Sequence, residues 1–234
     1  MAQKNVLAEL EKAFEVTEAS DDFDVHLDFK EVLLASSEPD VIAYHFELLQ
    51  RTKNDALLEV LAQFFKWRGK SGEAYLVARL AAETEPFLIS IGLQILGAMK
   101  SKSAIEFARQ YISHADERVR ERACIVLGWV GTRKDLATLR DLGLNDPSVN
   151  VRKWAATQQM HIWLRYPVAK NTVVAYLSEA IQQETDNDVL EMIIYTAQEV
   201  LRRRFGLKAG ESASNLTEAK RKAAVALTNL ANKK

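Results

Sequence analysis

An apolar pattern recurs in this chain at intervals of 31 to 38 residues, and this period limits its possible folds more than any other feature. The stretch 119–123 recurs 32 positions later at 151–155, and both copies begin with Val-Arg and end with Ala. The apolar positions continue without the arginine from Leu88, from Leu57 and from Val189. A helix pair of this length cannot bury its apolar side alone, so neighbouring pairs must stack.

Periodicity and composition both favour helices over strands. Apolar residues follow the i, i+3, i+4, i+7 rhythm of a helix almost throughout. The chain has only 4 Pro and 9 Gly, whereas an all-β chain needs turn residues about every 8–12 positions. We predict helices over residues 4–19, 24–35, 39–51, 55–67, 72–82, 86–99, 102–113, 116–130, 134–142, 147–164, 168–183, 186–204 and 215–231. The predicted fold class is all-α, an α-solenoid of stacked antiparallel helix pairs.

The repeated stretch resembles the HEAT repeat, a unit of two antiparallel helices. The signature is an acidic residue before the second helix, then Val-Arg, then a small residue four positions after the Val. It is carried by Asp116, Val119-Arg120 and Ala123, and again by Asp146, Val151-Arg152 and Ala155. The resemblance covers about residues 39–204, and only these two units carry the full Val-Arg form.

This resemblance gives each position of the motif an expected role. Val119, Ala123 and Leu127 form a buried seam, and the small Ala123 lets helices approach closely. We interpret Arg120 and Arg152 as structural residues that reach an acid of their own or an adjacent repeat. The resemblance also implies that the second helix of each pair lines the concave surface.

Segments of different character divide the chain. We expect acidic capping helices over 1–38, HEAT-like repeats over 39–206, a linker over 207–214 and a basic capping helix over 215–234. Gly69-Lys70-Ser71-Gly72 reads as a turn within the repeats.

Charge is concentrated at the two ends of the chain. Residues 1–50 hold 3 Lys/Arg against 12 Asp/Glu, and residues 201–234 hold 9 against 2. The acidic end suggests either a solvated face or a docking patch for a basic protein, formed by Asp21, Asp22, Asp24 and Asp28. At the other end, Arg202, Arg203 and Arg204 follow a predicted helix, where cations favour the helix dipole or an acidic partner.

The predicted helix 147–164 departs from the pattern of its neighbour. Gln158 and Gln159 stand where the preceding repeat has Val126 and Leu127. Either this helix is rotated so that Met160, Ile162 and Trp163 take the core, or it reserves polar groups for a partner. In the second case the binding residues are Arg118, Arg122, Lys153, Trp154, Gln158 and His161. Trp154 fits the core as well as a contact.

No catalytic constellation is found in the sequence. The 4 histidines form no His-x-x-x-His pair, and Cys124 is the only cysteine, expected as a buried inert thiol. No Gly-x-Ser-x-Gly, P-loop or Gly-x-Gly-x-x-Gly motif occurs. We therefore assign no catalytic residue, metal or cofactor, and the balance favours a protein that is not an enzyme.

The sequence favours a cytoplasmic protein-binding solenoid, a scaffold, adaptor or inhibitor. The resemblance implies that a compact bacterial HEAT protein can serve as an inhibitor or immunity protein, and the acidic N-terminal region of this chain would suit neutralisation of a basic toxin. The alternative is a DNA glycosylase built from HEAT-like repeats, or another nucleic-acid-binding enzyme. Trp154 and Trp163 suit that class, but no Asp lies between them and residues 51–200 are nearly neutral, which argues against nucleic acid. A third hypothesis is a lyase or chaperone-like subunit resembling the phycobilin lyases, but no residues in the sequence identify a bilin pocket. No apolar stretch is long enough to span a membrane.

Overall fold

The computed structural model describes residues 2–207 and 215–231, which contain no strand. Its α-helices are α1 (Ala2–Glu18), α2 (Phe23–Leu34), α3 (Pro39–Arg51), α4 (Asp55–Phe65), α5 (Gly69–Leu80), α6 (Pro86–Ala98), α7 (Lys102–Tyr111), α8 (Glu117–Val130), α9 (Leu136–Asn145), α10 (Val149–Arg165), α11 (Lys170–Gln183), α12 (Asn187–Leu201) and α13 (Leu216–Ala231). Three short 3₁₀ turns, η1 (Lys66–Arg68), η2 (Arg133–Asp135) and η3 (Pro167–Ala169), precede α5, α9 and α11. The predicted all-α solenoid of antiparallel helix pairs is confirmed.

Local signals explain where these helices start. Asp116 and Asp186 accept hydrogen bonds from the first backbone N–H groups of α8 and α12, and Glu85 does the same for α6. Pro39 and Pro86 occupy the first helical positions of α3 and α6, where their missing N–H groups cost little.

Several predicted boundaries are wrong; the helix expected over 134–142, for example, continues as α9 to Asn145. Residues 69–72 begin α5 instead of forming a separate turn, because Gly69 takes φ 57° and redirects the chain after η1. The helix expected over 186–204 ends at Leu201, because Arg202 adopts the left-handed conformation with φ 52°. The arginines therefore cap and follow the helix. Of the expected linker, Leu207 is buried and residues 208–214 lie outside the described part.

Contacts divide the chain into an N-terminal unit, residues 1–104, and a C-terminal unit, residues 105–234. In the N-terminal unit the pairs α1–α2, α3–α4 and α5–α6 pack in chain order. Arg68 joins them in its buried position, donating from Nε to His45 Nδ1 at 2.8 Å and to the carbonyls of Leu33 and Ser36, both at 2.9 Å. Burial lowers the pKa of His45 to about 3, so the imidazole is neutral and accepts this hydrogen bond.

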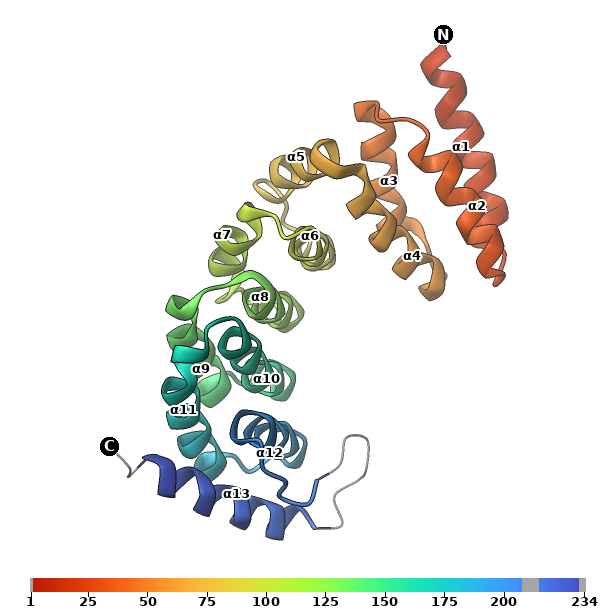
Figure 1. Ribbon diagram of the computed structural model, residues 1–234. Coiled ribbons are helices and arrows are strands. Elements are labelled where there is room, and N and C mark those ends of the chain that lie inside the picture. The colour runs from red at the N-terminus through yellow and green to blue at the C-terminus, as the bar shows by residue number, and fades with distance from the viewer. Residues whose placement is uncertain (1, 208–214, 232–234) are drawn as a thin grey trace. The chain divides into compact units, whose positions relative to one another are not determined.

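The C-terminal unit consists of two layers of helices (Figure 1). Helix α10 packs between α8 and α12 in one layer, while α9 and α11 form the other. Val119, Ala123 and Leu127 of α8 are completely buried, as predicted for the seam. Helix α13 packs across α11 and α12. We call the surface of α8, α10 and α12 turned away from α9 and α11 the α8/α10/α12 face.

Candidate protein-binding surface

Helices α8 and α10 each carry an arginine that binds an acid of the next repeat. Arg120 of α8 donates to both carboxylate oxygens of Asp146, at 2.8 and 2.9 Å. Arg152 of α10 repeats this with Glu184, at 2.8 and 3.3 Å. Each also donates through Nη1 to backbone carbonyls at the turn before its own helix. The predicted ladder role is confirmed, and the acid belongs to the adjacent repeat.

The ladder is largely removed from water. The side chains of Arg120 and Asp146 are 12% and 3% exposed, and those of Arg152 and Glu184 are 16% and 8% exposed. Burial raises the pKa of Glu184, but hydrogen bonds from Arg152 and two backbone N–H groups lower it further, so the carboxylate stays charged. The register of α8, α10 and α12 is therefore set by bidentate, charge-assisted hydrogen bonds.

Three expected basic contact residues have different surroundings. Arg118 is exposed and pairs with Asp116 at 2.7 Å, so its charge is partly used at the start of α8. Arg122 and Lys153 are half-buried, and neither forms an ion pair with another described residue. Burial lowers the pKa of Arg122. An unpaired, partly desolvated guanidinium is poised to gain a partner's carboxylate or carbonyl.

Each of the three helices carries an aromatic side chain that reaches the surface, although the three stand at different positions of the repeat. Trp154 of α10 is half-buried, and the corresponding residues one repeat before and after are Arg122 and Met192. Trp129 of α8 is 38% exposed and stands 32 residues before His161. Tyr195 of α12 is also half-buried. Trp129 and Tyr195 were not predicted from the sequence. The repeat offset could have found them, because it relates Trp129 to His161 and relates Tyr195 to the residue before Gln158.

Gln158 is not accessible, which corrects its selection as a contact residue. Its side chain is 0% exposed because Gly128 of α8 leaves room for it between the helices. Gln159 is also 0% exposed. Neither suggested explanation holds in full: Met160 and Ile162 are buried and Trp163 is half-buried, yet both glutamines remain inside.

His161 connects the buried glutamine to the half-buried surface. Its Nδ1 lies 2.8 Å from Gln158 Oε1, so the imidazole and the amide are hydrogen-bonded. Burial, with Arg165 nearby, lowers the pKa of His161, which keeps the imidazole neutral around pH 7. Gln158 Nε2 and both amide atoms of Gln159 have no hydrogen-bond partner among the described residues.

The two charged clusters at the chain ends are both on the surface. Asp21, Asp22, Asp24 and Asp28 are exposed, and Asp22 caps α2 through the N–H of Asp24 at 2.9 Å. The nearby Glu18 is instead structural, because it accepts from Thr52 Oγ1 and from the Lys53 N–H. Arg202, Arg203 and Arg204 are exposed beyond the end of α12.

Groups of catalytic type are placed as structural residues. Cys124 is completely buried, and burial raises the pKa of its thiol well above the usual range. His26 and His45 are buried and bond backbone carbonyls. Over residues 2–207 and 215–231, no three His, Cys, Asp or Glu side chains are grouped to hold a metal ion. Within the same residues no helix combines the length and apolar character needed to cross a bilayer.

Stacked helix pairs joined by an arginine ladder define the chain as an α-solenoid repeat protein. A family model described as HEAT repeats matches residues 73–161, so this part of the chain is similar to HEAT repeats. The match is narrower than the span 39–204 inferred from the sequence, but it includes both Val-Arg repeats. HEAT repeats form helical scaffolds that typically mediate protein interactions. A search of curated proteins gives no match.

Proposed function

We propose that this chain is a non-enzymatic protein-binding scaffold and that the α8/α10/α12 face is its contact surface. One observation carries the proposal: three adjacent helices, locked by the Arg120 and Arg152 ladder, present half-buried aromatic side chains beside unpaired cations. Tryptophan, tyrosine and arginine are the residue types enriched at interface hot spots. Because the helices are already fixed, little conformational entropy is lost when a partner binds.

Site-specific photo-crosslinking tests this proposal in the native host. A photoreactive phenylalanine replaces Trp154, and a matched variant carries it at Thr172, which is exposed on α11 of the other layer. We expect a discrete protein adduct from position 154 and none from position 172. Adducts from position 172 alone, or from neither position, would contradict the assignment of this face.

We further propose that the acidic patch of Asp21, Asp22, Asp24 and Asp28 receives a basic protein, as an inhibitor of the immunity type would. The support is exposure and charge: all four carboxylates reach solvent, and residues 1–104 hold 17 Asp/Glu against 11 Lys/Arg. Complementary charge chiefly accelerates association.

The test is stopped-flow or surface binding to the captured partner. Replacing Asp21, Asp24 and Asp28 with asparagine should slow association about ten-fold at low salt, with little change in the dissociation rate. An unchanged association rate would remove the patch from the function.

A further inference from the structure

The turns that follow α8, α10 and α12 lie along one edge of the C-terminal unit. The ladder places the starts of these helices side by side, because Arg120 and Arg152 lie in the first turns of α8 and α10 and Glu184 precedes α12. Parallel helices that start at one edge end at the opposite one. The ends of α8 and α10 do lie side by side, because Arg165, the last residue of α10, donates to the carbonyls of Gly128 and Gly131 at the end of α8.

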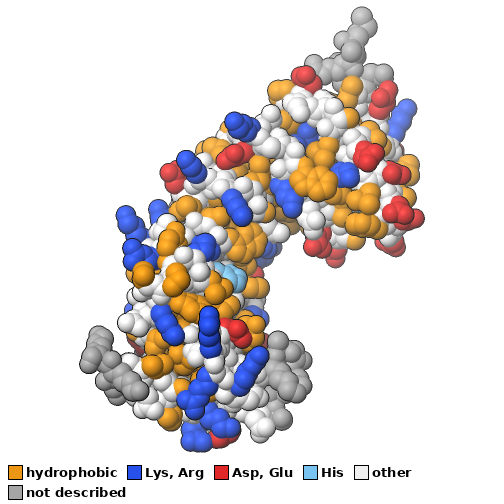
Figure 2. All heavy atoms as spheres, viewed as in Figure 1, with side chains coloured by type: hydrophobic (Ala, Val, Ile, Leu, Met, Phe, Trp, Pro, Cys, Tyr) orange, Lys and Arg blue, Asp and Glu red, His pale blue; other side chains and the backbone are white. Residues whose placement is uncertain are grey.

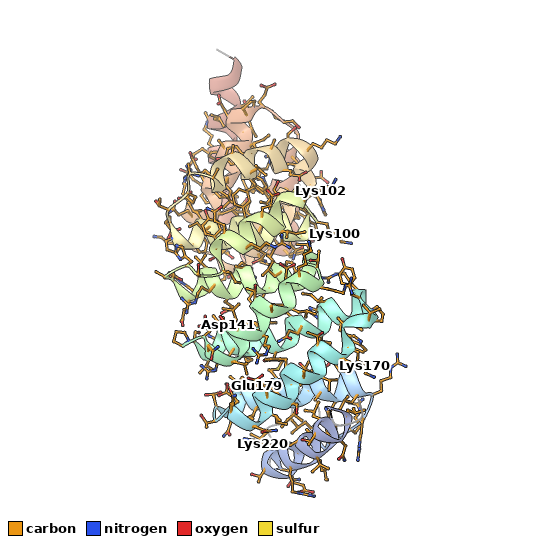
Figure 3. All side chains as sticks on the ribbon, turned by 90° about the vertical axis from the view of Figure 1, so that its left-hand side faces the viewer. Lys100, Lys102, Asp141, Lys170, Glu179 and Lys220 are labelled. Atoms are coloured by element: carbon orange, nitrogen blue, oxygen red, sulfur yellow. The ribbon has the colours of Figure 1, made fainter. Side chains whose placement is uncertain are left out.

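Exposed cations gather at every one of these turns. We define the basic edge by Arg133, Lys134, Lys170, Arg202, Arg203 and Arg204, all exposed. Figure 2 looks onto this edge, and over the C-terminal unit Lys and Arg far outnumber Asp and Glu on it. Figure 3 shows Lys170 at one border of the unit, with Asp141 and Glu179 toward the other.

The charges of the basic edge are not neutralised by the residues that the structure describes. None of its six cations forms an ion pair with a described residue, and Arg203 only approaches the Phe205 ring at 5.8 Å. The nearby carboxylate of Asp135 is 4% exposed and is already bound by Arg109 at 2.7 Å. Residues 105–234 as a whole hold 20 Lys/Arg against 15 Asp/Glu. The excess is thus available to a ligand.

Two apolar side chains project from the middle of the basic edge. Leu164 is 61% exposed and Val168 is 75% exposed, on either side of Arg165 and just before Lys170. A phosphate backbone gives such side chains nothing to bury against. An acidic protein segment that also carries apolar side chains satisfies both the cations and the two aliphatic groups.

We propose that the basic edge docks an acidic, leucine-bearing segment of a partner protein. This proposal rests on the protein-binding function above and adds the chemistry of the partner. Carboxylates of the segment pair with the arginines and lysines, while its apolar side chains cover Leu164 and Val168. Each exposed ion pair contributes little, so the affinity comes from several pairs together and falls with salt.

The experiment measures fluorescence polarisation of a labelled glutamate-rich peptide with leucine at every fourth position, using the full chain. A second peptide has serine in place of each leucine, and a third probe is an oligothymidylate. We expect the leucine peptide to bind most tightly at low salt. K170E/R204E should weaken it about ten-fold.

Two further variants separate this mechanism from general electrostatics. R221E/K222E changes the net charge equally on exposed α13 residues, and it should leave binding nearly unchanged. L164S/V168S should weaken the leucine peptide about ten-fold and the serine peptide hardly at all. Circular dichroism verifies that each variant is folded.

Three results would overturn the proposal: no binding of the leucine peptide, equal losses in K170E/R204E and R221E/K222E, or tighter binding of the oligothymidylate. The last result would assign the basic edge to nucleic acid. None of them would affect crosslinking from position 154, so the failure of this inference is distinguishable from the failure of the proposed function.

Discussion

Gln158 depends on a single small residue of the neighbouring helix. A Cβ added to Gly128 would lie 1.9 Å from Gln158 Oε1 and 2.7 Å from its Cβ. A change of rotamer can move the amide but not the Cβ, so the helices themselves would have to separate. Gly128 is therefore required for the close approach of α8 and α10.

We expect Gly128→Ala to destabilise the chain by about 1–3 kcal/mol, although alanine is the better helix former. The matched control is Gly92→Ala, whose Cβ would meet only the flexible end of Leu80 at 2.9 Å. Thermal unfolding followed by circular dichroism measures both. A loss for Gly92→Ala as large as that for Gly128→Ala would refute the explanation by helix approach.

His45 makes stability depend on pH. Its pKa is about 3 in the folded chain, below the ordinary value of 6.5, because burial and Arg68 both oppose its protonation. The unfolded chain therefore binds a proton first as the pH falls. The stabilisation from neutral His45 is complete above about pH 6.5 and is lost progressively as the pH falls towards 3.

At pH 5 this loss amounts to about 2 kcal/mol relative to pH 8. Urea unfolding at the two pH values measures it. His45→Gln keeps an acceptor for Arg68 but has no titrating group, so the difference between pH 8 and pH 5 should shrink by that amount. An identical pH dependence in the variant and the parent would show that His45 does not cause the effect.

Among the helical elements, the ladder determines how α8, α10 and α12 are held. Asp146 accepts from Arg120 and also from the Ser148 N–H, so one carboxylate joins two repeats and the start of α10. Its partner, the Arg120 guanidinium, uses Nε, Nη1 and Nη2 as donors. Removing either side chain would leave the other charge buried without compensation.

We expect Arg120→Ala to lower the free energy of unfolding by about 3 kcal/mol. The control is Arg221→Ala, which breaks the exposed pair with Glu218 and should lower the free energy of unfolding far less. Chemical denaturation of both variants measures these losses, and adding Asp146→Ala and the Arg120→Ala/Asp146→Ala double variant gives the coupling energy of the pair. Equal losses in the free energy of unfolding for the two arginine substitutions would show that the ladder does not stabilise the fold.

The sequence predicted the elements well because their apolar periodicity and their Asp and Pro start signals are local. The Val-Arg motif also predicted the ladder, since Arg120 and Asp146 hold fixed places in consecutive repeats. What it could not give was the burial of Gln158, which depends on Gly128 in another helix. Nor could it give the end of α12, because a left-handed arginine leaves no mark in the sequence pattern.

For the molecule as a whole, the charge pattern differs from the one read along the chain. The sequence placed acid at one terminus and base at the other, whereas in the C-terminal unit the acids at one edge are paired with arginines and the cations of the opposite edge form no ion pair with a described residue. Asp116, Asp146 and Glu184 lie where α8, α10 and α12 begin, and Arg133, Lys170 and Arg203 lie beyond their ends. Only the antiparallel stacking brings these distant residues into one row.

The central claim is that a partner protein binds across α8, α10 and α12, and a structure of the crosslinked complex tests it most directly. The account predicts that the partner lies against Trp129, Trp154 and Tyr195, with Arg122 and Lys153 newly paired. A partner seated on α9 and α11, with these aromatic residues still in solvent, would contradict it.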